Sequence, residues 1–205
     1  MKTQNPDEVL ASLELDWAAL IPILTPHLVR AAHEAGAELI LRLGLDHDLF
    51  GKVAPSLALM ARSRAAALVG KRIVGDRLID NPDAKWRIDE STRDMLRTTV
   101  TTAIDEGWDA QTTRKAIVSS FGFSDARALM IARTERAWIQ NHASHLTAVK
   151  SGVLKHKTWQ TAGDEAVCEV CSDNADTTVP LESSFPSGDP FPPAHPNCSC
   201  TVDYG

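Results

Sequence analysis

Four cysteines and one histidine near the C-terminus are the residues of this chain best suited to bind a metal ion. Cys168 and Cys171 form a Cys-x2-Cys pair, and Cys198 and Cys200 follow after 26 further residues, with His195 three residues before Cys198. Zn²⁺ prefers four sulfur or nitrogen ligands in a tetrahedron, and a Cys-x2-Cys turn can supply two of them. We therefore predict a structural Zn²⁺ site built from four of these five residues, and the sequence leaves open which four.

Two disulfides, or four free thiols, are the alternatives to a metal site. The N-terminus lacks a basic start followed by an apolar core, so we expect no secretory signal. No apolar run reaches the roughly 18 residues that a membrane span requires, so we expect no membrane contact. Thiols in a reducing cytoplasm normally stay reduced, which favours metal over disulfides. The tail around the cysteines is also poor in apolar residues, and such segments commonly need a disulfide or a bound metal to stabilise their fold.

The charge of the chain is unevenly distributed. The 205 residues carry 21 Lys plus Arg and 27 Asp plus Glu, a net charge of −6. Residues 158–205 contain eight acidic residues, no Lys or Arg, all four cysteines and six of the eleven prolines. Residues 1–157 therefore have a net charge of +2. We expect any contact with DNA to come from residues before Lys157 and not from the acidic tail.

The first 80 residues predict a helical region. Apolar spacing predicts helices over residues 7–20, stopped by Pro22, and over residues 26–43. The second of these has an apolar stripe made of Leu28, Ala32, Ala35, Leu39 and Leu43. A third, Ala-rich helix is expected to start at Pro55 and to run to residue 69, or on to residue 78. Turn-forming residues 80–85 mark the predicted boundary between a 1–80 region and an 86–205 domain.

The second half predicts three helices followed by a small sheet. The helices are expected over residues 89–106, over 109–120 with Asp109 as cap, and over 124–150 with Ser124 as cap. Alternating residues predict strands over 154–161 and 198–204. The fold class is therefore α+β: a mainly helical N-terminal region, then a long helix and a small β-sheet C-terminal domain. That domain carries the zinc-knuckle-like Cys/His cluster in its Cys-rich tail, residues 158–205.

Several short motifs in this half occur together in one known family. They are Ile131-Ala132-Arg133-Thr134-Glu135, Lys157-Thr158-Trp159, Asp164 before Cys168-Glu169-Val170-Cys171, and His195-Pro196-Asn197-Cys198-Ser199-Cys200. In this order and spacing they resemble the phage head morphogenesis, or Mu F-like minor head protein, family over about residues 90–205. Ser199 departs from the family pattern, which usually has a basic residue there. Residues 1–80 show no such resemblance and are interpreted as an adaptor or partner-binding region.

The resemblance implies a structural protein of the phage virion. Members act in head morphogenesis and in DNA packaging or delivery, associated with the portal or the procapsid interior. The expected partners are therefore the portal protein and other capsid or neck proteins. The expected location is the head or neck of the virion, with the host cytoplasm as the place of assembly. No catalytic activity comes with the family, so we predict that the protein is not an enzyme.

The alternatives to a structural protein are two kinds of enzyme, an ADP-ribosyltransferase-like effector and an HNH-like nuclease. Arg133 and Glu135 invite comparison with ADP-ribosyltransferases, but neighbouring residues on a helix point apart, so we interpret them as polar contacts between the long helix and the tail. Asp164 is interpreted as a turn-capping residue before the Cys-x2-Cys pair. An HNH-like nuclease would need a further helix after the last cysteine pair. Only five residues follow Cys200, which is too few for that helix.

His142 and His145 are expected on a solvated helix face.

Overall fold

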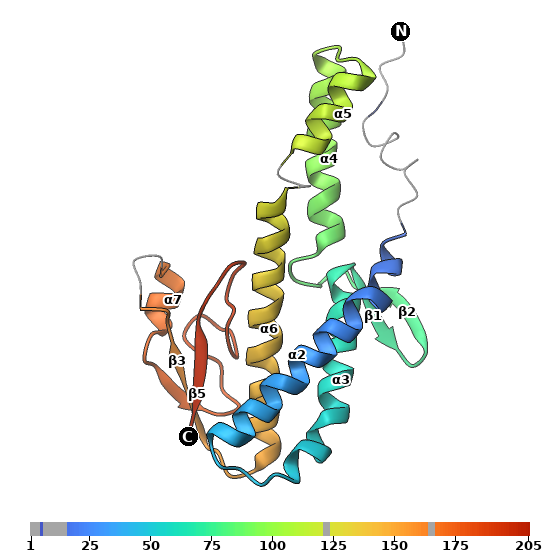
Figure 1. Ribbon diagram of the computed structural model, residues 1–205. Coiled ribbons are helices and arrows are strands. Elements are labelled where there is room, and N and C mark those ends of the chain that lie inside the picture. The colour runs from blue at the N-terminus through green and yellow to red at the C-terminus, as the bar shows by residue number, and fades with distance from the viewer. Residues whose placement is uncertain (1–4, 6–15, 121–123, 164–166) are drawn as a thin grey trace. The chain divides into compact units, whose positions relative to one another are not determined.

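The computed structural model describes residue 5 and residues 16–120, 124–163 and 167–205 (Figure 1). The predicted helix over residues 7–20 therefore lies largely outside the described residues, and so does Asp164. The α+β class is confirmed: helices dominate, with two small antiparallel sheets and a Cys/His cluster close to the C-terminus.

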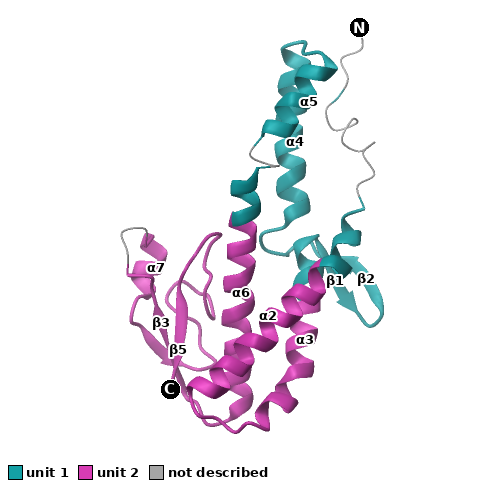
Figure 2. Cartoon of the chain, in the orientation of Figure 1, with its two compact units in different colours: residues 1–23, 63–129 teal, residues 24–62, 130–205 magenta. Residues whose placement is uncertain are grey.

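The chain divides into two compact units (Figure 2). Unit 1 comprises residues 1–23 and 63–129, and unit 2 comprises residues 24–62 and 130–205. Each unit thus takes segments from both sides of the predicted boundary at residues 80–85. The division into a 1–80 region and an 86–205 domain stays a prediction about separate folding domains. The compact units follow packing instead, since distant parts of the chain associate within each of them.

The first helices begin earlier than the sequence predicted. A 3-10 turn, η1 (Trp17–Ala19), leads into α2 (Leu20–Arg42), so the prediction that Pro22 stops a helix was wrong. Pro22 instead lies in the first turn of α2, where a backbone N–H would have no helical partner. The predicted apolar stripe is confirmed, since Leu28, Ala32, Ala35 and Leu39 are buried. A helix α3 (Leu49–Leu68) follows and includes Pro55, the residue predicted to start it.

The predicted continuation of the third helix to residue 78 was wrong. Gly70, with φ +68°, follows the end of α3, and the chain then forms the hairpin β1 (Lys71–Val74) and β2 (Arg77–Asp80). Val74 pairs with Arg77, which leaves Gly75 and Asp76 as a two-residue turn, and Gly75 has φ +59°. Such short turns favour glycine at a position of positive φ. The residues after α3 therefore form a hairpin and do not continue the helix.

The three helices of the second half are confirmed almost to the residue. They are α4 (Ile88–Asp105), α5 (Ala110–Ser119) and α6 (Asp125–Ser151). Both predicted caps form: the Asp109 carboxylate accepts from the N–H of Thr112 at 2.7 Å, and the Ser124 hydroxyl accepts from the N–H of Arg127 at 3.2 Å. The buried guanidinium of Arg127 donates to the hydroxyls of Ser91 and Thr92, which joins the start of α6 to α4 within unit 1.

The C-terminal sheet of unit 2 has three antiparallel strands in the order β4-β3-β5. The strands β3 (His156–Gln160) and β5 (Thr201–Tyr204) confirm the two predicted ones. The strand β4 (Thr178–Pro180) and the short helix α7 (Glu169–Asn174) were not predicted.

The core of unit 2 joins this sheet to the helices. Trp159 is fully buried and meets Phe185 edge-on, with ring centroids 5.0 Å apart. Leu39 of α2 and Ala148 of α6 belong to the same buried cluster, together with Val202. The tail therefore obtains from the helices the apolar contacts that its own sequence lacks.

Candidate metal centre

The five predicted ligands come from two segments of unit 2. Cys168 is the N-cap residue of α7 and Cys171 lies in its first turn, so one helix start presents both thiols to the same side. His195, Cys198 and Cys200 lie on the segment that leads into β5. Cys171, Cys198 and Cys200 are buried, whereas Cys168 and His195 are half-buried.

The structure brings all five residues together. The Nε2 atom of His195 lies 3.2 Å from the sulfur of Cys168 and 3.3 Å from that of Cys171. The sulfurs of Cys171 and Cys198 are 3.6 Å apart. Cys168, Cys171 and His195 form one group with ligand atoms within 4.8 Å of one another, and Cys171, Cys198 and Cys200 form a second. These two groups could hold a metal ion, and Cys171 belongs to both.

The surroundings of these atoms suit a bound cation. The Nδ1 atom of His195 lies 2.9 Å from the carbonyl oxygen of Pro196, and donation there leaves Nε2 as the free acceptor facing the thiols. Burial raises the pKa of the Cys171 and Cys200 thiols, because a thiolate is poorly solvated there. A cation at the centre of the cluster would supply the charge that buried thiolates need.

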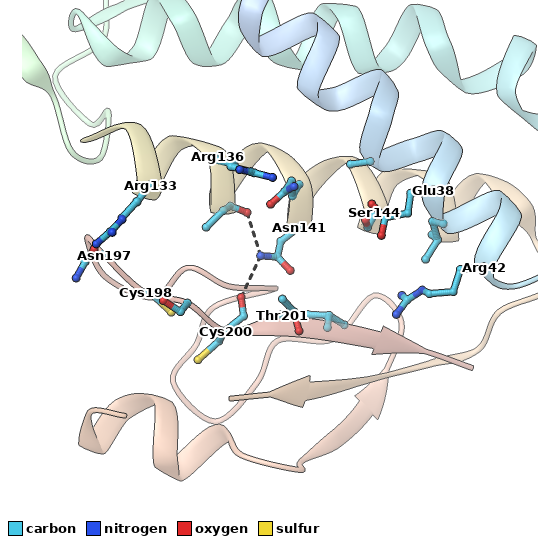
Figure 3. A pocket seen from close by; sticks show the side chains of 16 residues that line it. Glu38, Arg42, Arg133, Arg136, Asn141, Ser144, Asn197, Cys198, Cys200 and Thr201 are labelled. Carbon is cyan, nitrogen blue, oxygen red and sulfur yellow. Dashed lines mark hydrogen bonds between the residues drawn. The ribbon is translucent and has the colours of Figure 1, made fainter. Parts of the chain in front are cut away.

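Two side chains of α6 hold the ligand-bearing segment in place. The hydroxyl of Thr134 accepts a 2.8 Å hydrogen bond from the N–H of Asn197. The side-chain amide of Asn141 donates to the carbonyl of Cys200 at 3.3 Å (Figure 3). Asn197 has φ +62°, a left-handed conformation that asparagine tolerates better than most residues. Thr134, Asn141 and Asn197 were not predicted as site residues, although Thr134 and Asn197 lie inside the family motifs.

The other predicted site residues are placed differently. Glu135 is buried on α6, with 6% of its surface exposed, while Arg133 is exposed. Thr134, the residue between Arg133 and Glu135, accepts the hydrogen bond from Asn197 that joins α6 to the tail at this level. The role of Arg133 and Glu135 as polar contacts stays a prediction, and Asp164 lies outside the described residues.

The expectation that His142 and His145 lie on a solvated face was wrong. Their ring centroids lie 4.8 Å and 5.3 Å from that of Phe191, and His145 also lies 6.3 Å from Tyr204. Burial, with smaller contributions from Lys157 and His142, lowers the pKa of His145 to about 4. The tail covers this side of α6, which the sequence of α6 alone does not reveal.

Comparison with known proteins decides the family. The family model described as phage Mu protein F like protein matches residues 94–203. The chain belongs to this family. The match runs from α4 to β5 and includes all five residues of the Cys/His cluster, which confirms the resemblance seen in the motifs.

Membership of the phage Mu protein F like family makes this chain a phage head-related protein. No curated protein and no solved structure matches the chain. None of the helices in the described part of the chain is both long and apolar enough to cross a membrane.

Proposed function

We propose that this protein is a structural and assembly component of a tailed-phage head. In this role it associates with the portal or the procapsid interior and acts in head morphogenesis and in DNA packaging or delivery. The match to the phage Mu protein F like family over residues 94–203 is the observation that carries the proposal. The portal protein and other capsid or neck proteins are the proposed partners, and the virion head or neck is the proposed location.

The Cys/His cluster is proposed to bind one structural Zn²⁺. With Zn–S bonds of about 2.3 Å and Zn–N bonds of about 2.0 Å, the ligands of one tetrahedral Zn²⁺ lie roughly 3.5–3.8 Å apart. The distances from His195 Nε2 to the sulfurs of Cys168 and Cys171, and from Cys171 Sγ to Cys198 Sγ, are 3.2–3.6 Å and close to those values. Cys198 lies outside the group in which the ligand atoms of Cys168, Cys171 and His195 are all within 4.8 Å of one another, so zinc binding would draw a fourth ligand closer to these three. Ligand sets made of three or four cysteines, with at most one histidine, are typical of structural zinc sites. The ion would hold α7 against the segment before β5.

The protein is proposed to act without catalytic turnover. Arg133 is exposed and Glu135 is buried although only one residue separates them, so they do not present a shared face to a substrate. Substituting Glu135 with Gln should therefore abolish no activity. An NAD-dependent ADP-ribosyl transfer that this variant loses would instead favour the ADP-ribosyltransferase-like alternative.

Two measurements test the zinc site and the nuclease alternative. Elemental analysis of the purified chain should find one zinc per chain, and chelation should release four reactive thiols. A preparation with neither zinc nor free thiols would contradict the metal site. Incubation of the zinc-loaded chain with plasmid DNA and added Mg²⁺ should leave the DNA intact. DNA cleavage that Cys171→Ser abolishes would favour the HNH-like nuclease alternative.

The assembly role is tested in the phage that encodes the chain. Mass spectrometry of purified procapsids and virions should detect the protein in few copies, and cryo-electron microscopy should locate it near the portal. Deleting its gene should lower the yield of infectious particles without changing portal synthesis. Absence of the protein from both particles would contradict the proposal.

A further inference from the structure

A groove in unit 2 runs between α6, the C-terminal half of α2 and the segment 197–202 (Figure 3). Its volume is about 440 Å³, within the range of natural ligand pockets. One face of α6 lines it from Arg133 to Ser144, which corresponds to about 16 Å along a helix axis. About five residues of an extended chain would span that length. Small residues, Ala35, Ala137 and Ser144, leave the space open.

The wall opposite α6 is the outer edge of the sheet. The backbone N–H and C=O of Trp159 are bonded to Thr177 and Asp176, on the β4 side of β3. Trp159 pairs with Val202, so the backbone groups of Val202 must point away from β3. The carbonyl of Cys200, two residues earlier, points the same way and accepts from Asn141 of α6. In the described sheet β5 is an edge strand, and its unpaired backbone at Val202 lies beside the groove.

The charges around the groove are mainly positive. Arg42, Arg133 and Arg136 line it, and Glu38 is the one acidic residue in its lining. Arg42 is already paired with Asp203 at 3.1 Å. Arg133 and Arg136 are exposed and make no ion pair with any residue that the structure describes. Because they are three residues apart on a helix, both guanidinium groups can approach the same carboxylate.

These features favour a peptide over a nucleic acid. An edge strand offers alternating N–H and C=O groups, which match a peptide backbone but not a chain of phosphodiesters. Proteins that bind single strands stack the bases on aromatic side chains, and none of the residues lining this groove is aromatic. A double helix is too wide to enter a concave groove of this size.

We propose that this groove is the docking site for an extended acidic segment of a partner protein. That segment adds a strand to β5 by pairing with the backbone of Val202, and it places a carboxylate against Arg133 and Arg136. The inference goes beyond the proposed head-assembly role and concerns unit 2 alone. Its test uses only the purified, zinc-loaded full chain, so it can fail while the assembly role stands.

Peptide display gives the first test. A library of random seven-residue peptides selected on the full chain should enrich Asp or Glu flanked by β-branched residues. The best peptide, fluorescently labelled, should bind with an affinity that falls at least tenfold in the double variant Arg133→Glu, Arg136→Glu. The matched control is Arg114→Glu with Lys115→Glu on α5, two exposed cations with the same charge change, which should bind like the wild type. Absence of acidic enrichment, or equal loss in both variants, would overturn the proposal.

The strand pairing has its own readout. In the free protein the amide of Val202 should exchange quickly by NMR, while that of Asp203, which faces β3, should exchange slowly. Bound peptide should slow exchange at Val202, and N-methylation of alternate peptide amides should abolish binding. Unchanged exchange at Val202 in the bound state would overturn the pairing. A 20-base-pair duplex or a (dT)20 strand that competes with the peptide through Arg133 and Arg136 would assign the groove to nucleic acid instead.

Discussion

The hydroxyl oxygen of Thr134, in α6, accepts a 2.8 Å hydrogen bond from the backbone N–H of Asn197, 63 residues later in the chain. The same hydroxyl donates its hydrogen to the carbonyl of Met130 within the helix. A lone pair on the hydroxyl oxygen therefore accepts the bond from Asn197. This bond connects α6 to the segment that carries His195 and Cys198. The long helix therefore fixes the position of the Cys/His cluster as well as packing against the sheet.

Replacing Thr134 with Val should show what this bond contributes. The shape is kept, but the N–H of Asn197 loses its partner, so the free energy of unfolding should fall by about 1–2 kcal/mol. The affinity for the metal should fall about tenfold, as for other residues that orient ligands. Denaturant unfolding and zinc competition measure the two effects. Thr99→Val in α4 is the matched control, since Thr99 makes the same bond within its helix and should cost little.

Replacing Asn197 with glycine should change the stability of the fold little, whereas a β-branched residue there should lower it. Its φ of +62° is strained for most side chains, and its own side chain is exposed, so little packing is lost on substitution. Asn197→Gly should change stability by less than about 1 kcal/mol, whereas Asn197→Val should cost about 1–3 kcal/mol. Thermal unfolding of both variants checks this. Equal stability of the two would mean that the backbone conformation at Asn197 does not constrain the cluster.

The cysteines should differ in their importance for metal binding. Cys171 belongs to both groups of convergent ligands and is 2% exposed, whereas Cys168 belongs to one group and is half-buried. Cys171→Ser should therefore lose zinc completely on dialysis against a moderate chelator. Cys168→Ser should retain part of it, because Cys171, His195, Cys198 and Cys200 remain. Zinc analysis of the dialysed proteins is the measurement, and identical losses would contradict a central role for Cys171.

Local chemistry explains which parts of the fold the sequence predicted. The caps of α5 and α6 depend on Asp109 and Ser124, each acting within three residues, and both helices were predicted closely. The alternative end of the third helix at residue 78 was wrong, because residues 71–80 pair as a hairpin whose turn includes Gly75 at positive φ. Strand β4 has three residues, too few to show a period, and depends on pairing with β3.

The candidate site shows the same distinction between local and distant contacts. Its five metal-binding candidates were found from residue type and spacing, and the structure brings them together. Thr134 and Asn141 act on residues 63 and 59 positions away, so no local pattern marks them. His142 and His145 resemble a polar helix face until Phe191 from the tail packs on them.

His145 should make the protein less stable in mild acid. Its pKa is lowered from 6.5 to about 4 in the folded state, so between these values the unfolded chain binds the proton more readily. Stability therefore falls as the pH decreases from 6.5 to 4, by up to about 3 kcal/mol for this group. Unfolding of the wild type and of His145→Gln over this range isolates the effect, because acid release of metal affects both. A constant difference between them would contradict the shift.

Lys157 should produce a stability gain as the pH rises. Its side chain is 1% exposed, its ammonium donates to the carbonyl of Pro190 at 2.6 Å, and it lies 5.4 Å from the centroid of the Phe185 ring. Burial lowers its pKa from 10.5 to about 8, which means that the charged form is disfavoured in the folded state. Below pH 8 the fold carries this cost, up to about 3 kcal/mol, and the cost disappears as the pH rises from 8 to 10.5.

Lys157→Met tests this burial cost directly. At pH 7 the variant should be more stable than the wild type by about 1–2 kcal/mol, because removal of the buried charge outweighs the lost bond to Pro190. The difference should shrink or reverse by pH 10, where the wild-type side chain becomes neutral. Lys155→Met is the matched control, since Lys155 is exposed directly before β3 and should show no pH-dependent difference. Denaturant unfolding at both pH values measures the effect, and a Met variant that is less stable at pH 7 would mean that the ammonium stabilises the fold.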